Sequence, residues 1–235
     1  MNYLNKQQFD LGAECQEDAT VSTAVLTRKT ELIEQQKLEL GATEEAQRML
    51  LNQELAVIQI DLDQGELAWN NAFPAFKMHL EKHQWEQAAA VCDTLFRSNQ
   101  PDSLVALGHG LWLSITFPVD PTLTVAQLQH VINETPEDSD GAAVAAAVAA
   151  YIVDLRGDDN ASDDATLAVG QMLNEVARRH GNAHNQEEFD QWFRRLELDQ
   201  PNKLLVRMRN IIDVLVQDQW WIDRDSLQQL IPEVD

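Results

Sequence analysis

The segment 142–156, AAVAAAVAAYIVDLR, places the strongest constraint on how this chain can fold. It is apolar as far as Tyr151, and alanine is the residue that favours helix most. A helix that is apolar on all sides lies inside a protein, where small side chains let neighbouring helices approach closely. About a dozen apolar residues precede Asp154, whereas a membrane span needs roughly 20. We therefore predict a buried central helix of an α-helical domain and no membrane-spanning segment here.

Apolar residues recur at helical spacing through most of the remaining chain. Leu51, Leu55, Ile58 and Leu62 follow one another at intervals of four, three and four, which favours helix over the strand that partial alternation in 53–63 would also allow. Asp120 and Pro121 could supply the cap and the first residue of the next helix, but Thr124, which leads into VAQLQHVI, is the preferred start. Further helical patterns cover 66–83, 84–97, 104–117, 164–180, 187–198 and 203–218. The sequence predicts an all-α fold of about ten helices in antiparallel pairs, as a helical bundle or an irregular array like that of helical-repeat proteins.

One pair of these segments has the features of a known helical hairpin. The second segment carries the small residues Ala88 and Ala89, an aromatic residue three positions before them at Trp85, and Pro101 after it. In these features the pair 66–83 and 84–97 resembles one tetratricopeptide-type hairpin. The sequence shows no second copy at a fixed period, so the resemblance covers this hairpin alone. It implies that neighbouring helices pair in antiparallel fashion.

Composition divides the chain into three parts. Residues 1–22 are polar without an apolar period and are predicted to be a flexible arm. Residues 23–64 carry one apolar stripe, interrupted at Gly41, and are predicted to form a helical hairpin or a dimerising arm. Residues 65–235 are predicted to form an all-helical globular domain.

The net charge limits the classes of partner. The chain has 17 Lys and Arg against 39 Asp and Glu, a formal charge of −22. Direct binding of nucleic acid or of an anionic membrane needs basic residues, so we expect this chain to bind neither. A solubilising surface, a surface for a basic partner and a mimic of nucleic acid remain open, and a halophilic host could account for the acidity with no partner at all. Two cysteines and an N-terminus without a signal-peptide pattern predict a cytoplasmic protein.

The charge is unevenly distributed along the chain. Residues 98–177 contain one basic residue, Arg156, and twelve acids, whereas 178–209 contain seven Lys or Arg. Such an asymmetry suits docking on a basic surface, or head-to-tail contact in a homo-oligomer. Trp220 and Trp221 cannot both be buried on one helical face, so one ring is predicted to face a partner or another part of the fold. The candidate partner-binding residues are Glu134, Glu137, Asp138, Asp140, Asp158, Asp159, Asp163, Asp164, Trp220 and Trp221.

Chemical motifs are sparse. His79 and His83 are four residues apart, a spacing that on one helical face can hold a metal ion, and they carry the alternative hypothesis of a helical metal-dependent enzyme or regulator. The acidic loops lack the Gly and Glu of a calcium-binding EF-hand loop, and neither a phosphate-binding loop nor a GxSxG motif occurs. We expect no cofactor and no catalytic residue. The sequence therefore favours a non-catalytic adaptor, assembly factor or chaperone-like subunit that binds a protein with a basic surface, and an acidic nucleic-acid mimic is the second alternative.

Overall fold

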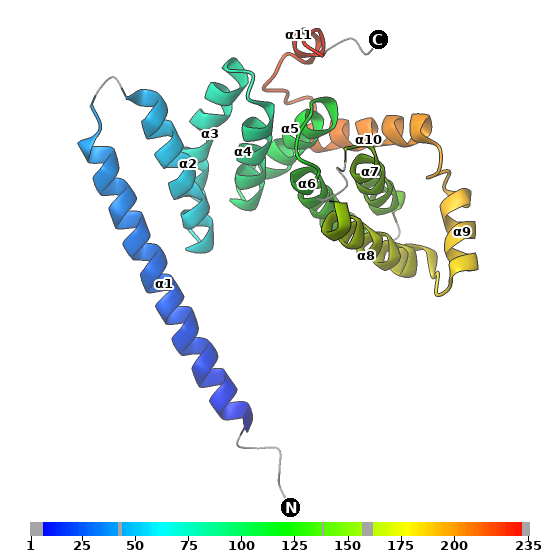
Figure 1. Cartoon of the computed structure of the whole chain (residues 1–235), viewed down its shortest axis with the longest axis horizontal. Helices are drawn as coiled ribbons and strands as arrows, with labels where there is room; N and C mark the ends of the chain where they lie inside the picture. Colours follow the sequence, from blue (N-terminus) through cyan, green and yellow to red (C-terminus); the bar gives the residue numbers. More distant parts are fainter. Residues whose placement is uncertain (1–6, 42–43, 138, 157–161, 232–235) are drawn as a thin grey trace, which may run out of the picture.

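The computed structural model describes residues 7–41, 44–137, 139–156 and 162–231, and the side chains from Ser22 onward except those of 162–164. Within these ranges the chain forms helices and no strand, which confirms the predicted all-α fold (Figure 1). The segment 53–63 belongs to a helix. The helices are α1 (Gln7–Glu39), α2 (Glu45–Asp61), α3 (Gly65–Glu81), α4 (Trp85–Arg97), α5 (Ser103–Thr116), α6 (Pro121–Glu134), α7 (Asp140–Arg156), α8 (Ser162–Gly181), α9 (Gln186–Arg195), α10 (Pro201–Val216) and α11 (Arg224–Gln228).

Most helices pack on their neighbours in the sequence. The pairs α2–α3, α3–α4, α4–α5, α6–α7 and α7–α8 make the main contacts, while α2 also touches α4 and α6 also touches α8. Three of the helices end in the same turn, with Asp63, His83 and Glu197 in the left-handed conformation at φ of 57°, 55° and 52°. The next N–H in each case reaches back five residues, as from Gln64 to the carbonyl of Gln59 at 2.8 Å. This satisfies the last carbonyls of the helix and reverses the chain within a few residues.

The alanine-rich helix α7 is central, as predicted. Its alanines from Ala142 to Ala149 are buried, with exposed fractions of 3% or less. Helices α6, α8 and α10 all pack on it. The small side chains permit this because helix axes can approach only as closely as the side chains between them allow.

Helix α10 joins parts of the chain that are distant in the sequence. It packs on both α5 and α7, and it runs across α7 in Figure 1. Its inner face is Leu204, Met208, Ile212 and Val216, all of which are buried. The approach to α5 is close, since a Cβ added to Gly108 would lie 2.6 Å from Cγ2 of Val216.

Helix α1 stands apart from this core. Leu26 and Ile33 pack against Leu55 and Ile58 of α2, and the rest of α1 extends well beyond α2 (Figure 1). The helix begins at Gln7, so its backbone is helical through much of the segment 1–22. Helix α2 in turn packs on α3, so the helical array continues across residue 64. The division into an arm, a hairpin and a domain stays a prediction.

The start of α6 differs from the predicted one. The helix begins at Pro121 rather than after Thr124. The Asp120 carboxylate accepts a hydrogen bond from the Thr122 N–H at 2.7 Å, and proline is well suited to the first helical position. The Thr124 hydroxyl instead donates to the carbonyl of Asp120. Among the described residues, no helix is both long and apolar enough to cross a bilayer.

Candidate partner-binding groove

The structure contains an open apolar groove between α10 and the connection from α6 to α7. Its volume is about 430 Å³. The apolar residues that line it come from α5, α6, the connection and α10: Leu104, Val131, Pro136, Ile211, Val214 and Leu215. Glu134 is the one charged residue among the described residues of the lining. The groove can therefore accept an apolar side chain and offers a carboxylate at its edge.

One wall of the groove follows from the amphipathic character of α10. The inner face of α10 packs against α5 and α7. On another side of the same helix, Val206, Asn210 and Val214 recur at intervals of four. Val214 is 71% exposed and Val206 is 54% exposed. Val214 adjoins the other apolar residues of the groove, and a contiguous exposed apolar patch is a feature of binding surfaces.

The opposite wall is held in place by the turn between α6 and α7. The Thr135 hydroxyl donates to the carbonyl of Val131 at 2.6 Å, and the Ser139 N–H donates to the carbonyl of Pro136 at 3.0 Å. A Cβ added to Gly141 would lie 3.1 Å from Cγ2 of Thr135, so the turn lies directly on the first turn of α7. These contacts hold Thr135, Pro136 and Ser139 of the wall against α6 and α7.

Beside the groove, Asp140 is the centre of a chain of polar contacts. The Trp192 indole N–H donates to Nδ1 of His180 at 3.0 Å, and Nε2 of His180 lies 3.2 Å from a carboxylate oxygen of Asp140. Since an indole can only donate, Nδ1 must accept and Nε2 carries the proton toward Asp140. Arg207 lies 3.2 Å from the other oxygen of Asp140 and also donates to the carbonyl of Leu196. Asp140 therefore ties α7 to α8, α9 and α10.

The other acidic candidates differ in their placement. Glu134 lines the groove, and Glu137 is exposed next to Pro136. Asp138, Asp158 and Asp159 lie outside the described residues. Asp163 and Asp164 belong to the first turn of α8, and their side chains also lie outside the described part. Of the acidic candidates with described side chains, the structure thus places Glu134 in the lining of the groove.

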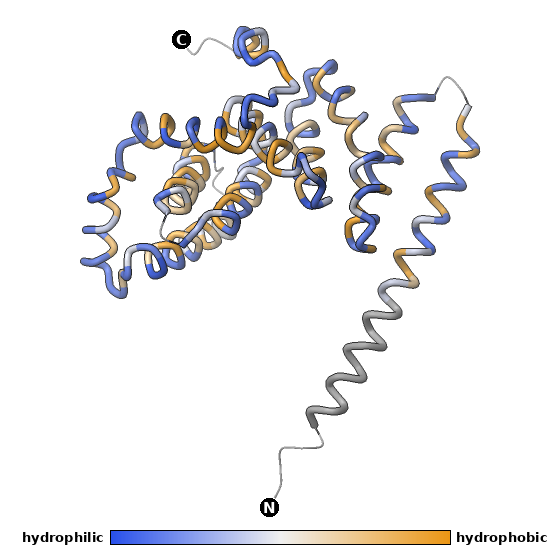
Figure 2. Tube along the Cα trace, turned by 180° about the vertical axis from the view of Figure 1, so that it is seen from behind, coloured by the Kyte–Doolittle hydropathy of each residue, from blue (hydrophilic) through white to orange (hydrophobic). Residues whose placement is uncertain are grey.

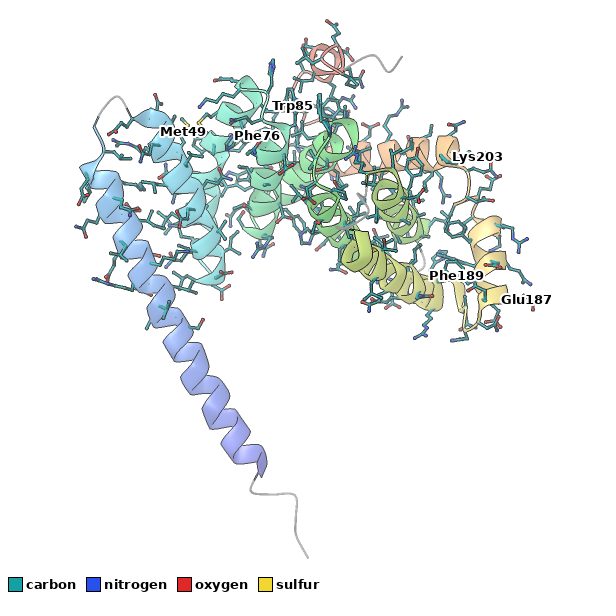
Figure 3. All side chains as sticks on the ribbon, viewed as in Figure 1. Met49, Phe76, Trp85, Glu187, Phe189 and Lys203 are labelled. Carbon is teal, nitrogen blue, oxygen red and sulfur yellow. The ribbon has the colours of Figure 1, made fainter. Side chains whose placement is uncertain are left out.

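Both tryptophans of the pair pack against other parts of the same chain. Trp221 stacks on His109, with ring centroids 4.4 Å apart, and contacts the rings of Phe73 and Phe76 on α3; Phe76 is labelled in Figure 3. Trp220 contacts His109 and Trp112, and the Arg224 guanidinium lies 4.1 Å from the centroid of its ring. Both rings are half-buried. The sequence predicted that one ring faces a partner or another part of the fold, and in the structure both rings contact side chains of α3, α5 or α11.

The prediction that His79 and His83 share a helical face is wrong. Helix α3 ends at Glu81, and His83 adopts the left-handed conformation beyond it, where it is exposed and stacks on Trp85. His79 is buried, with its two ring nitrogens 2.8 Å from Gln84 and 3.0 Å from Gln53. The two rings therefore point into different surroundings. The described residues contain no group of three or more His, Cys, Asp or Glu arranged to hold a metal ion.

Comparison with known proteins adds no assignment, since no protein family, no curated protein and no solved structure matches this chain. The groove itself was not predicted from the sequence. The available signal was the spacing of Val206, Asn210 and Val214 on α10, but Asn210 and Val214 line a groove only because α10 crosses α5 and α7.

Proposed function

We propose that this protein is a non-catalytic adaptor that binds an amphipathic segment of a partner protein in the groove beside α10. The apolar side of the segment would cover Val214, Ile211 and Leu104, and a basic residue of the segment would face Glu134 and Glu137. The observation that carries the proposal is an apolar groove that remains open to solvent and has an acidic edge.

Two further properties support this choice of ligand. Val214 and Leu104 are 71% and 40% exposed, so covering them removes apolar surface from water. The formal charge of −22 attracts a basic segment and repels an acidic one, which raises the rate of encounter with the former. Helix-in-groove recognition uses this combination of an apolar trough and a charged rim.

The test uses two synthetic amphipathic helices as probes, one of Leu and Lys and one in which Glu replaces Lys. Binding to the full chain is measured by fluorescence anisotropy at low and high salt. We expect the Leu/Lys helix to bind and the Leu/Glu helix not to bind. Val214→Gln should weaken binding of the Leu/Lys helix about tenfold, because it removes one apolar anchor without changing the charge. Glu134→Gln should weaken it less, and chiefly at low salt.

Leu167→Gln is the matched control. Leu167 is 62% exposed on α8 and lies outside the groove lining, so its replacement removes a comparable exposed apolar side chain elsewhere. Affinity for the Leu/Lys helix should stay unchanged in this variant. Equal loss in Val214→Gln and Leu167→Gln, or unaltered binding in Val214→Gln, would show that attraction to the acidic surface alone holds the probe and would refute the groove as the binding site.

A further inference from the structure

The residues that follow α10, 217–231, form a strap that lies against α3 and α5. Its main anchor is Trp221, whose ring stacks on His109 of α5. On α3, the rings of Phe73 and Trp69 meet the Trp221 ring edge-on, with centroids 5.0 and 6.0 Å away. The Trp221 N–H donates to Nε2 of His109 at 2.8 Å. The surface beneath the strap therefore receives an aromatic ring and a backbone N–H at one place.

The strap lies on this surface without becoming part of the core. None of the residues 217–231 is fully buried, and both tryptophan rings keep part of their surface in water. Apart from the Trp221 N–H, the backbone hydrogen bonds described for the strap are with α10 or within the strap itself. Its helix α11 packs substantially on no other described helix, and α11 is mostly blue, hence hydrophilic, in Figure 2. The strap can therefore leave the surface without dismantling the helical array.

The start of the strap holds two residues in an unfavourable backbone conformation. Gln217 and Asp218 are both left-handed, with φ of 50° and 64°, and neither is glycine. One left-handed residue is the usual end of a helix, so Gln217 is explained by the end of α10. A second one is not needed for that purpose, and it carries the steric cost of a side chain in this conformation. Release of the strap frees Asp218 from this cost.

The charge of the strap is a poor match for the protein on which it lies. Residues 217–231 contain three aspartates and one arginine, in a chain with a formal charge of −22. The arginine, Arg224, makes the favourable contacts: its guanidinium lies 3.1 Å from the Asp213 carboxylate and 4.1 Å from the centroid of the Trp220 ring. A segment with the same aromatic pair and the same basic residue, but without the aspartates, would be attracted where the strap is repelled.

We infer that the aromatic surface of α3 and α5 is a second binding site, which the strap occupies until a segment of a partner protein replaces it. The strap itself defines the chemistry of that segment: two adjacent aromatic residues, and a basic residue four positions after the first of them, as in Trp220, Trp221 and Arg224. The second ring of the partner would stack on His109, and its basic residue would meet Asp213.

The strap also sets how strongly a partner must bind. Because it is tethered to its site, it competes at a high effective concentration, and a partner binds only to the fraction of molecules in which the site is uncovered. The side chains that the strap contacts on α3, α5 and α10 do not line the groove beside α10. This inference is therefore independent of the proposed function.

The probe for this site is a labelled synthetic peptide with the sequence of 217–231, and its binding to the full chain is measured by fluorescence anisotropy. The variant Trp220→Ala/Trp221→Ala should bind this peptide about tenfold more tightly than the wild type does, because its own strap no longer competes. A peptide in which alanine replaces both tryptophans should not bind. A peptide in which lysine replaces the three aspartates should bind more tightly than the original one, chiefly at low salt.

Two further substitutions locate the peptide on the protein. Added to the double variant, Phe73→Ala should weaken binding of the peptide about tenfold, because it removes a ring that the peptide contacts. Phe189→Ala is the matched control, since Phe189 is a half-buried aromatic residue of α9, away from the strap (Figure 3), and it should leave the affinity unchanged. Arg224→Gln in the otherwise unaltered chain should also bind the peptide more tightly than the wild type, so that the result does not depend on the folding of the double variant.

The inference is overturned if neither the double variant nor Arg224→Gln binds the peptide saturably while circular dichroism shows the helix content of the wild type. Equal affinities of the wild type and the double variant would also overturn it, as would equal losses in Phe73→Ala and Phe189→Ala. Val214→Gln should keep the affinity of the wild type for the peptide, and a loss there would place the peptide in the groove instead. Binding of the Leu/Lys helix, measured in parallel, reports on the proposed adaptor function separately.

Discussion

Replacing His109 should remove a specific part of the dependence of stability on pH. His109 is fully buried on α5, and its Nδ1 lies 2.8 Å from the carbonyl of Val105. Its Nε2 accepts the backbone N–H of Trp221 at 2.8 Å, so Nδ1 carries the single proton of a neutral ring. Burial lowers the pKa of His109 from 6.5 to about 4, and the hydrogen bond to Val105 offsets a part of this shift. Through the hydrogen bond from the Trp221 N–H, the neutral ring holds the segment that follows α10 against α5.

The sign and size of the effect follow from the two pKa values. Between pH 6.5 and about 4 the unfolded chain binds a proton at His109 that the folded chain excludes. The stability contributed by the neutral ring is complete above pH 6.5 and is lost as the pH falls toward 4. The lowering of the pKa corresponds to about 3 kcal/mol over this window, at about 1.4 kcal/mol per unit.

The assay compares the free energy of unfolding of the wild type and of His109→Gln by urea titration at several pH values from about 7 to about 4. The advantage of the wild type, which is its free energy of unfolding minus that of His109→Gln, should shrink by about 3 kcal/mol as the pH falls from about 7 to about 4. Titrations of the carboxylates cancel in this difference. His83→Gln, which removes an exposed imidazole beyond α3, is measured in parallel as the control for the loss of a histidine as such. An advantage that stays constant with pH would refute a buried neutral His109, as would a ring resonance that titrates near pH 6.5 in NMR spectra.

Three further predictions concern helix contacts and ends, and urea or thermal unfolding measures each. Gly108→Ala should destabilise the protein by about 1–3 kcal/mol, because the new Cβ would lie 2.6 Å from the buried Val216. Gly170→Ala, whose Cβ would have no atom within 4 Å, should stabilise the protein by about 0.5–1 kcal/mol. Equal effects of the two substitutions would contradict the close approach of α5 and α10. Asp120→Ala should cost about 1 kcal/mol through loss of the cap of α6, and an unchanged midpoint would argue against that cap. Arg156→Met should cost about 1–3 kcal/mol because its guanidinium donates to carbonyls at the end of α5, and no loss would mean that water satisfies them equally well.

Much of the fold could be predicted from the sequence because helix formation depends on local spacing. The apolar run 142–156 predicted a buried helix, and the structure has one there. The spacing of four, three and four in 51–62 favoured helix over the strand suggested by partial alternation, and this segment is helical. The start of α6 was misplaced because Thr124 and Asp120 are both good cap residues. The choice between them depends on which side chain reaches a free N–H, and this is a property of the folded turn.

The candidate site was predictable only in part, because it depends on contacts between distant segments. The acids of 134–140 were selected by charge, and Glu134 does line the groove, yet Asp140 is held by His180 and Arg207. The rings that receive Trp220 and Trp221 lie on α3 and α5, more than a hundred residues earlier. The spacing of His79 and His83 suggested one helical face, but the left-handed turn at His83 ends the helix between them. No local pattern reports such long-range pairings.

The crossing of α10 over α5 and α7 also determines how this molecule can open. Most of the helices contact only their near neighbours in the chain, so a terminal hairpin such as α1–α2 can fray without disturbing distant parts. Helices α5, α7 and α10 have to separate together, because α10 is wedged against both of the others. Amide hydrogens should therefore exchange in a gradient, fastest in α1 and slowest in the three interlocked helices, and hydrogen–deuterium exchange followed by mass spectrometry can record that order directly.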